Sequence, residues 1–263
     1  MSITAVDSRN ETIPAGMSDA EWKVRCDLAA SYRLCALWGW TDLNNTHISA
    51  RVPGTEDTFL LNPFGLLFDE ITASSLIKVD RDGNVLSDSE YGANRAGFVI
   101  HSSIHMAVPH LHFVMHSHSR YGTAVSMQKD GLLPVSQKAL TVMGWLAYHD
   151  YEGPTMRPDE QERLVASLGA NKVLILRNHG LLTTGATLEE AFINMFRLQR
   201  ACEIQVAAQA GGAELTIPSE SVCEDAARMA DEFLEDTSGD DLGKPEFDAY
   251  LRLMDKLDPS YRD

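Results

Sequence analysis

The sequence predicts an α/β fold, in which one αβα-layered domain is built around a mixed sheet. Strand-like and helix-like segments alternate irregularly along the 263 residues, and several strands are joined by short turns such as Asp82-Gly83. A doubly wound parallel sheet would need a helix between successive strands, so hairpins favour a mixed sheet. The sequence contains neither an internal repeat nor a low-complexity linker, and we therefore expect a single domain.

We expect this domain to span residues 18–212. Residues 1–17 are polar and unpatterned, and we expect a flexible arm there. Residues 213–263 are acidic and predicted to be partly helical, around 221–235 and 245–257. We expect this last segment to be an extension of the domain, because it is too short and polar for a core of its own.

The first half of the domain begins with a clear helix signal. Ser18 and Glu21 form a capping box, and the helix that it opens is predicted to end at Gly39. A short helix is predicted from Thr72, and Asn94 is predicted to cap a helix that Pro109 ends. Residues 44–52 are predicted to be a loop that runs into a strand, and the other predicted strands in this half are 58–61, 76–79 paired with 85–86, and 112–118.

The second half is predicted to be mainly helical around one buried strand at 172–177. Thr187 and Glu190 form a second capping box, which opens a long helix ending at the Gly211-Gly212 pair. The other predicted helices are 122–127, most of 135–148, and a helix from Pro158 to Gly169.

The charge of the chain excludes some partners. It carries 22 Lys and Arg against 38 Asp and Glu, a formal net charge of −16 with neutral histidine. Nucleic acids and anionic membrane surfaces are bound by clustered cations, so we expect neither as a partner. The net negative charge does not exclude an anionic small molecule as a ligand, because cations inside a cleft can make the electrostatic potential there positive.

Cysteine usage and the absence of long apolar runs predict a cytoplasmic protein. The four cysteines, Cys26, Cys35, Cys202 and Cys223, show no CxxC spacing, and we expect reduced thiols. The N-terminal residues lack the cationic start and apolar run of a signal peptide. No apolar stretch approaches the roughly 18–20 residues that span a bilayer.

Histidines are concentrated in one part of the chain: six of the nine lie between His101 and His118. In the strand that contains them, His116 and His118 are two residues apart and therefore point to the same face. Their backbones lie roughly 6–7 Å apart, so both imidazoles can bind one metal ion. A third imidazole, His179, follows a strongly apolar strand, where loops of α/β domains commonly carry functional residues.

Three imidazoles with open coordination positions indicate a catalytic metal rather than a structural one. Such a site suits Zn²⁺, and also Fe²⁺, Mn²⁺ or Co²⁺. The ion would polarise a carbonyl or hydroxyl, and a general acid or base would move protons. The candidate acids and bases are Glu70, His149, Asp150, Glu152 and Tyr261.

Two other histidine pairs remain open as metal ligands. His101 and His105 lie one turn apart on the same face of a predicted helix. His110 and His112 follow Pro109 in a predicted loop. A single buried histidine is more often a hydrogen-bonded core residue than a ligand, so each pair also has a structural interpretation.

These motifs resemble the class II aldolase/adducin family over about residues 20–212. The resemblance rests on His116-Ser117-His118, Arg177-Asn178-His179-Gly180-Leu181, Thr46-His47-Ile48-Ser49-Ala50-Arg51 and Pro63-Phe64-Gly65. Segments similar to the adducin-like branch are Asn94-Arg95-Ala96-Gly97-Phe98 and Ala201-Cys202-Glu203-Ile204-Gln205-Val206.

The resemblance implies a three-layer αβα sandwich with a mixed, mostly antiparallel central sheet. It also implies a homotetramer with active sites at subunit interfaces, and a divalent metal on His116, His118 and His179. Tyr261 becomes a candidate catalytic residue by analogy with a C-terminal tyrosine of the sugar-phosphate aldolases.

The sequence departs from the aldolases of the family at the site itself. Those enzymes carry a Glu that ligates the metal and transfers protons, and Gly97 stands at the matching position here. The small residues that bind phosphate are replaced by His47, Phe64 and Arg95. We expect these three to contact the substrate, Arg95 through a carboxylate and Phe64 by stacking on an apolar or aromatic group.

Two function classes follow from these residues. The first is a metal-dependent lyase that cleaves a C–C bond of a small hydroxy- or keto-acid, by decarboxylation or retro-aldol cleavage. Water, His101 or Tyr261 would supply the proton, and loss of CO₂ requires no carboxylate base, which fits Gly97. The second is a non-catalytic interaction protein similar to the adducin head. Because the chain ends in an acidic segment without a Lys-rich run, we do not expect actin as its partner.

Overall fold

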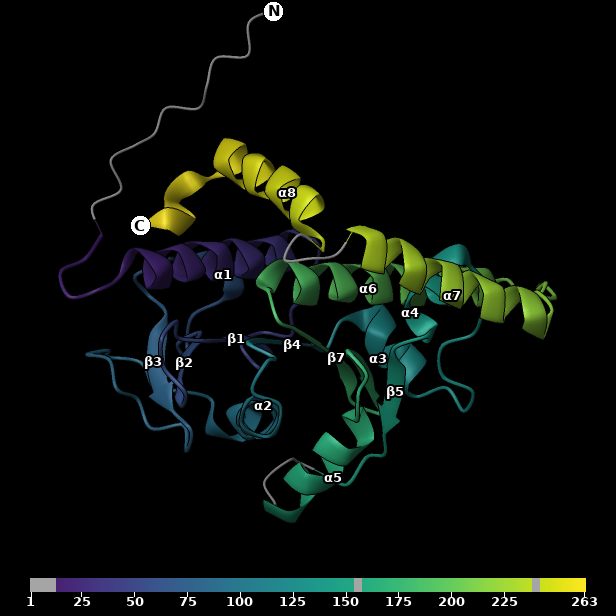
Figure 1. The fold of residues 1–263 in the computed structure, drawn as a ribbon, viewed down its shortest axis with the longest axis horizontal. Helices are drawn as coiled ribbons and strands as arrows, with labels where there is room; N and C mark the ends of the chain where they lie inside the picture. The colour runs from purple at the N-terminus through teal and green to yellow at the C-terminus, as the bar shows by residue number, and fades with distance from the viewer. Residues whose placement is uncertain (1–12, 154–157, 238–241) are drawn as a thin grey trace, which may run out of the picture.

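A seven-stranded sheet forms the centre of the part of the chain that is described by the computed structural model, residues 13–153, 158–237 and 242–263 (Figure 1). Its strands are β1 (His47–Arg51), β2 (Thr58–Leu61), β3 (Ile77–Asp80), β4 (Phe113–Ser117), β5 (Leu146–His149), β6 (Val173–Leu176) and β7 (Gly180–Gly185). Their order across the sheet is β3-β2-β1-β4-β7-β6-β5, so β4 lies in the middle. β5 and β6 run parallel, and the other neighbouring pairs are antiparallel.

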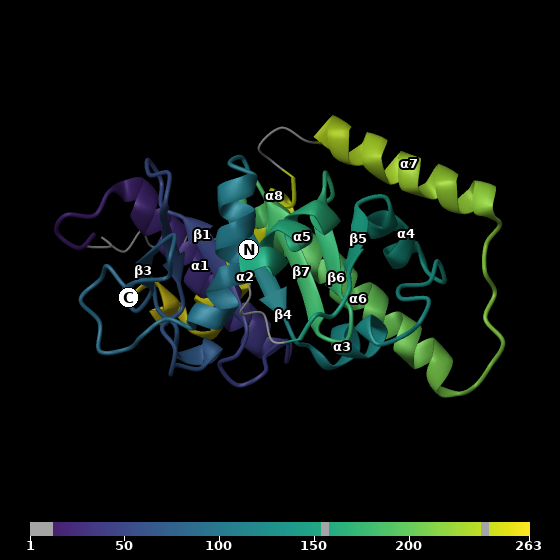
Figure 2. The ribbon, with the colours of Figure 1, turned by 90° about the horizontal axis from the view of Figure 1, so that it is seen from below.

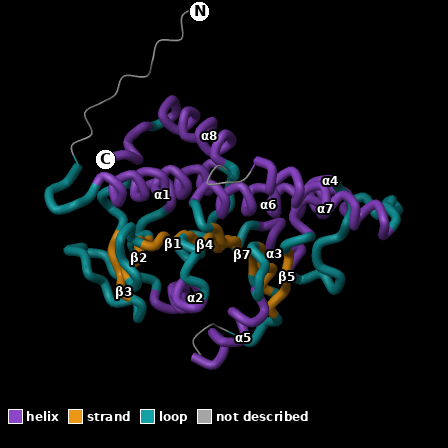
Figure 3. Tube along the Cα trace, in the orientation of Figure 1, coloured by secondary structure: helices purple, strands orange, loops and turns teal. Residues whose placement is uncertain are grey.

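Helices cover both faces of the sheet. α1 (Asp19–Leu37) and α6 (Leu188–Ala210) lie on one face, and α2 (Arg95–Ala107) and α5 (Pro158–Leu168) lie on the other (Figures 1 and 2). The shorter α3 (Arg120–Ser126) and α4 (Gln137–Met143) pack against α6. Figure 3 shows the strands between the two helical layers. The predicted three-layer αβα fold with a mostly antiparallel sheet is confirmed.

The core has two main parts because side chains alternate along each strand. Phe113 of β4 packs in the cluster that includes residues of α1 and α6. Val114, one residue later, packs on the opposite face with Ile100 of α2 and Leu164 of α5. His116 is two residues after Val114, so its side chain points to the same face of the sheet, which α2 covers.

The predicted helix caps are present. The side chains of Ser18, Asn94 and Thr187 each accept a hydrogen bond from the backbone N–H three residues later, at the starts of α1, α2 and α6. Each bond satisfies one of the N–H groups that a helix start leaves without an internal partner. The cap at Asn94 fixes where α2 begins beside β4.

Two local predictions are wrong, and one strand was missed. The helix predicted over 135–148 ends at Met143, and β5 follows it. β7 was not predicted at all. Instead of a helix from Thr72 there is a turn, because the side chains of Thr72 and Ser75 bond each other's backbone and satisfy it locally. The predicted pairing of 76–79 with 85–86 includes one bridge, Val79 with Val85.

The C-terminal segment forms α7 (Glu220–Thr237), α8 (Lys244–Leu257) and a 3₁₀ turn, η2 (Pro259–Arg262). α7 packs on α4, and α8 passes over α1, where it buries Phe247 and Met254 in the larger core cluster (Figure 1). Of the predicted N-terminal arm, residues 1–12 lie outside the described residues. Among the helices of the described ranges, none has the length and apolar character to cross a membrane.

Candidate metal centre

The first two imidazoles come from the end of β4. His116 pairs with His47 of β1 and with Leu182 of β7, so its backbone is held in the middle of the sheet. β4 ends at Ser117, so His118 lies one residue beyond the strand rather than within it. The two imidazoles are nevertheless adjacent, with ring centroids 4.6 Å apart and Nε2 atoms 2.8 Å apart.

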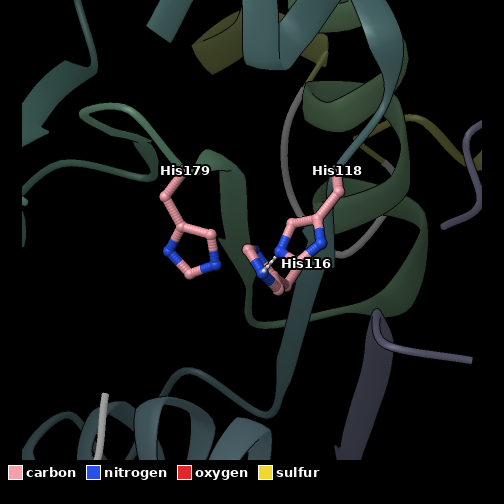
Figure 4. A group of neighbouring side chains, drawn as sticks. All are labelled: His116, His118 and His179. Carbon is pink, nitrogen blue, oxygen red and sulfur yellow. Dashed lines mark hydrogen bonds between the residues drawn. The ribbon is translucent and has the colours of Figure 1, made fainter. Parts of the chain in front are cut away.

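The third imidazole comes from the turn that joins β6 to β7. Asn178 has φ +57°, a left-handed conformation that turns the chain sharply before His179. Gly180 follows where a side chain would not fit, since a Cβ there would lie 2.4 Å from the carbonyl oxygen of Ser117. The ring of His179 lies 4.8 Å from that of His116 and 4.7 Å from that of His118, as Figure 4 shows.

The three imidazoles therefore converge as predicted, with their ligand atoms within 4.8 Å of one another. For His116 and His118, the hydrogen bonds indicate which ring nitrogen carries the proton. Nδ1–H of His116 donates to the carbonyl of Leu181, and Nδ1–H of His118 donates to the carboxylate of Asp42, both at 3.0 Å. The two Nε2 atoms that face each other then both carry lone pairs.

Two lone pairs 2.8 Å apart repel each other, and a cation between them removes the repulsion. The partners of the Nδ1 atoms, a carbonyl and a carboxylate, are those that commonly orient metal-binding histidines. The donor set therefore fits a divalent ion that accepts imidazole nitrogen.

Burial keeps the imidazoles of His116 and His179 neutral. Desolvation, followed by the proximity of His179, lowers the pKa of His116 well below its usual range. Desolvation, followed by the proximity of His118, lowers the pKa of His179 to about 4. Neutral imidazole is the form that binds metals, so both rings are ready to act as ligands at neutral pH.

A second group of imidazoles lies beside the first, between β1 and α2. Nδ1–H of His105 donates to the carbonyl of Leu111 at 3.0 Å. The hydroxyl of Ser49 then donates to Nε2 of His105 and accepts from Nδ1 of His101, both at 2.7 Å. His101 and His105 are therefore held by a core hydroxyl, which supports their structural interpretation. The other ring nitrogen of His101 has no partner within the described residues.

His47 joins the two groups. Its ring lies 4.1 Å from that of His101 and 5.4 Å from that of His116, and its Nε2–H donates to the carbonyl of Gly97 at 2.7 Å. A Cβ at Gly97 would lie 2.5 Å from Cε1 of His47. The imidazole of His47 thus fills the space that a side chain at position 97 would require.

A cleft of about 680 Å³ opens over the three converging imidazoles. Its remaining lining comes from the start of β1, from α2, from α3 and from loops. Within the described residues, this lining consists of Asp42, Asn45, His47, Asn94, Gly97, Ile100, Arg120, Thr123, Ala124, Met127, Tyr151, Gly153 and Asn178. Small molecules can therefore reach the ring nitrogens from solvent.

Comparison with known proteins identifies the family. The model of the Class II Aldolase and Adducin N-terminal domain matches residues 26–206. The chain belongs to the class II aldolase/adducin family. A Pseudomonas aeruginosa protein, provisionally named an aldolase class 2 protein, is 52% identical over 262 residues, which are 99% of this chain and 100% of that protein.

Two further relatives come from different branches of the family. The structure of L-fuculose 1-phosphate aldolase from Glaciozyma antarctica has a TM-score of 0.80 and 28% identity, and the match covers 96% of this chain and 98% of that chain. Alpha-adducin from Rattus norvegicus is 40% identical over 265 residues, which are 97% of this chain but 36% of the adducin. Family and neighbour together support an aldolase-type lyase in general terms.

The other predicted site residues of this class II aldolase/adducin domain lie at different positions relative to the cleft. His47 lines the cleft, whereas His101 lies behind it. Phe64 is 45% exposed, forms a bridge with Gly92 and is not among the described cleft-lining residues. The side chain of Arg95 lies outside the described residues.

Tyr261 is not part of the described cleft lining. It is buried in the core cluster beside α1, and its hydroxyl donates to Asp255 at 2.7 Å. Glu152, another candidate base, pairs with Arg163 and lines a small pocket beside the cleft together with His179. Within one chain, neither residue is therefore part of the described lining of the cleft over the three imidazoles.

Sequence reasoning missed Asp42 and Arg120. Asp42 precedes β1 and meets His118 through the fold, so no spacing in the sequence signals it. Arg120 follows His118 by two residues, and this proximity to the histidine motif was the available signal.

Removing the hydroxyl of Ser49 should destabilise the fold. Ser49→Ala would leave a buried N–H of His101 and a buried lone pair of His105 without partners, and we expect a loss of about 2–4 kcal/mol in unfolding free energy. Urea denaturation measures it. The control is Ser103→Ala, whose hydroxyl bonds only the carbonyl of Ile100 in its own helix. Equal losses for the two variants would contradict the assigned network.

Proposed function

We propose that this chain is a divalent-metal-dependent lyase that cleaves a C–C bond of a small hydroxy- or keto-acid. The observation that carries the proposal is the convergence of His116, His118 and His179 beneath an open cleft. Zinc is the proposed ion, with Fe²⁺, Mn²⁺ and Co²⁺ as ions that the same donors accept. A bound ion of this kind would supply a Lewis acid that stabilises negative charge developing on a substrate oxygen.

The cleft favours decarboxylation over retro-aldol cleavage. Retro-aldol cleavage begins with removal of a hydroxyl proton by a base, whereas decarboxylation begins with loss of CO₂. The carboxylate in the described lining is that of Asp42, which accepts a hydrogen bond from His118. His47 leaves no room for a side chain at Gly97. We therefore assign final protonation of the product to water in the cleft, and a supporting role to His101 behind His47.

The test is turnover by the zinc-loaded chain. We expect a panel of small hydroxy- and keto-acids to include one from which the protein releases CO₂, measured by a coupled assay alongside carbonyl products. His179→Ala should lose both zinc and turnover, since it removes one ligand. A protein that binds zinc stoichiometrically but converts none of the panel would contradict the proposal.

We also propose that the chain assembles as a homotetramer, as the family resemblance implies. The chain mass is 29.0 kDa, so light scattering should give about four times that value. A monomeric mass at micromolar concentration would contradict it.

A non-catalytic, adducin-like function is the second candidate. The observation that favours it is the 40% identity to alpha-adducin, together with the absence of a side chain at Gly97. Co-sedimentation with actin filaments at physiological salt tests the cytoskeletal form of this candidate. We expect no co-sedimentation, because the C-terminal segment is acidic.

A further inference from the structure

The charges in the cleft differ from those of the whole chain. The chain has a formal net charge of −16, which repels anions at long range. Within the described cleft lining, however, Arg120 is the one Lys or Arg and Asp42 the one carboxylate. The carboxylate of Asp42 accepts a hydrogen bond from His118. Within the described lining, the guanidinium of Arg120 is therefore the charged group that stays available to a ligand.

The backbone at Arg120 is fixed relative to the imidazoles. Ser119, between His118 and Arg120, is buried and caps α3 by accepting a hydrogen bond from Gly122 N–H. The backbone N–H of Ser119 donates to the hydroxyl of Ser117 at 3.1 Å.

A buried glutamine of α6 reinforces this turn. Nε2 of Gln199 donates to the hydroxyl of Ser117 at 3.0 Å, and the hydroxyl of Ser119 donates to Oε1 of Gln199. These bonds hold the start of α3 against α6, so the Arg120 side chain leaves the backbone from a constant position beside His118.

The guanidinium of Arg120 is available. Its side chain is exposed, and among the residues that the structure describes it makes no ion pair or hydrogen bond. Arg177, close to the site, is engaged, since it donates to the carbonyl of Gln128 and stacks on Tyr148. Arg120 differs from Arg177 in having five unused donors at the edge of the cleft.

We propose that Arg120 binds a carboxylate of the substrate in a bidentate fork, with the substrate's other end at the three imidazoles. The proposal rests on the proposed function for its premise that this cleft is the substrate site. A planar carboxylate matches a single guanidinium. A phosphate would be expected to use several donors, but the one Ser or Thr of the described lining, Thr123, donates to the carbonyl of His179 at 3.4 Å.

Titration calorimetry of the zinc-loaded full chain tests this assignment. The probes are pyruvate and glycolate, which carry a carboxylate, hydroxyacetone, which is neutral, and inorganic phosphate. We expect pyruvate or glycolate to bind, and Arg120→Gln to weaken that binding about tenfold or more. Arg120→Lys should recover only part of the loss, because an ammonium cannot form the fork. Hydroxyacetone binding should be the same in all of these variants.

Two further variants make the test specific. Arg200→Gln removes an exposed arginine that pairs with Glu203 on α6, and it should change nothing. Arg95→Gln tests the residue that the sequence analysis predicted for this role. Zinc content must stay at the wild-type level in Arg120→Gln, which shows that the imidazoles are intact.

Three results would overturn the proposal: no binding of either carboxylate by wild type, tighter binding of phosphate than of carboxylate, or a loss in Arg95→Gln without one in Arg120→Gln. Failure of the proposed function gives a different result. A protein that binds carboxylates through Arg120 but releases neither CO₂ nor a carbonyl product would retain this site and lose the lyase assignment.

Discussion

Replacing His116 by alanine should abolish stoichiometric zinc binding and leave the fold in place. The substitution removes one of three converging ligands, and the Nε2 atom of His118 loses the neighbour 2.8 Å away with which it would share the ion. Loss of a residue that only orients a ligand commonly costs about 10–100-fold in metal affinity, so loss of a ligand should cost more. Metal analysis after dialysis, with circular dichroism for the fold, measures both effects.

His110→Ala is the control for that experiment. His110 is exposed in the loop before β4 and is not one of the three converging histidines. The His110→Ala variant should therefore bind as much zinc as wild type. If His116→Ala kept its zinc and a variant lacking both His101 and His105 lost it, the metal would belong to the second pair instead.

Gly97→Ala should destabilise the wild-type protein, but it should not destabilise a protein that already carries His47→Ala. In wild type, the added methyl would meet Cε1 of His47 at 2.5 Å. His47 is buried and packed against His101, so it cannot move without cost, and we expect Gly97→Ala to lower the unfolding free energy by about 1–3 kcal/mol. Zinc affinity should also fall, because His47 contacts His116.

In a His47→Ala background the same methyl would enter vacated space. Alanine is a better helix former than glycine, so Gly97→Ala should there be neutral or stabilise by about 0.5–1 kcal/mol. Urea denaturation of all four proteins gives the coupling energy. Gly211→Ala, where a Cβ would meet nothing within 4 Å, is the matched glycine control. Equal effects of Gly97→Ala in both backgrounds would show that His47 does not occupy this space.

The sequence predicted what depends on local periodicity. The helix caps at Ser18, Asn94 and Thr187 follow from side chains three residues from the N–H groups they satisfy. The convergence of His116 and His118 follows from the two-residue period of a strand, and it holds although His118 lies just past the end of β4.

The missed strands have physical explanations. β7 is buried along its whole length, so it lacks the alternation of polar and apolar residues that reveals a strand with one exposed face. β5 is a strand of four residues directly after a helix, where apolar residues fit either structure. Its identity is decided by parallel pairing with β6, which is a long-range contact.

Much of the site depends on similar long-range contacts. The hydrogen bond of Asp42 to His118, and the insertion of His47 over Gly97, join residues about 76 and 50 positions apart in the chain. Phe64 and Tyr261 were predicted from family resemblance, and in the fold of one chain neither is part of the described cleft lining.

Anomalous diffraction at the zinc edge, from crystals grown with zinc, tests the central claim most directly. We predict one strong peak about 2.0–2.1 Å from a ring nitrogen of each of His116, His118 and His179, with a coordination position open to the cleft. A peak on another group of residues, or none at these three rings in a zinc-saturated crystal, would contradict it.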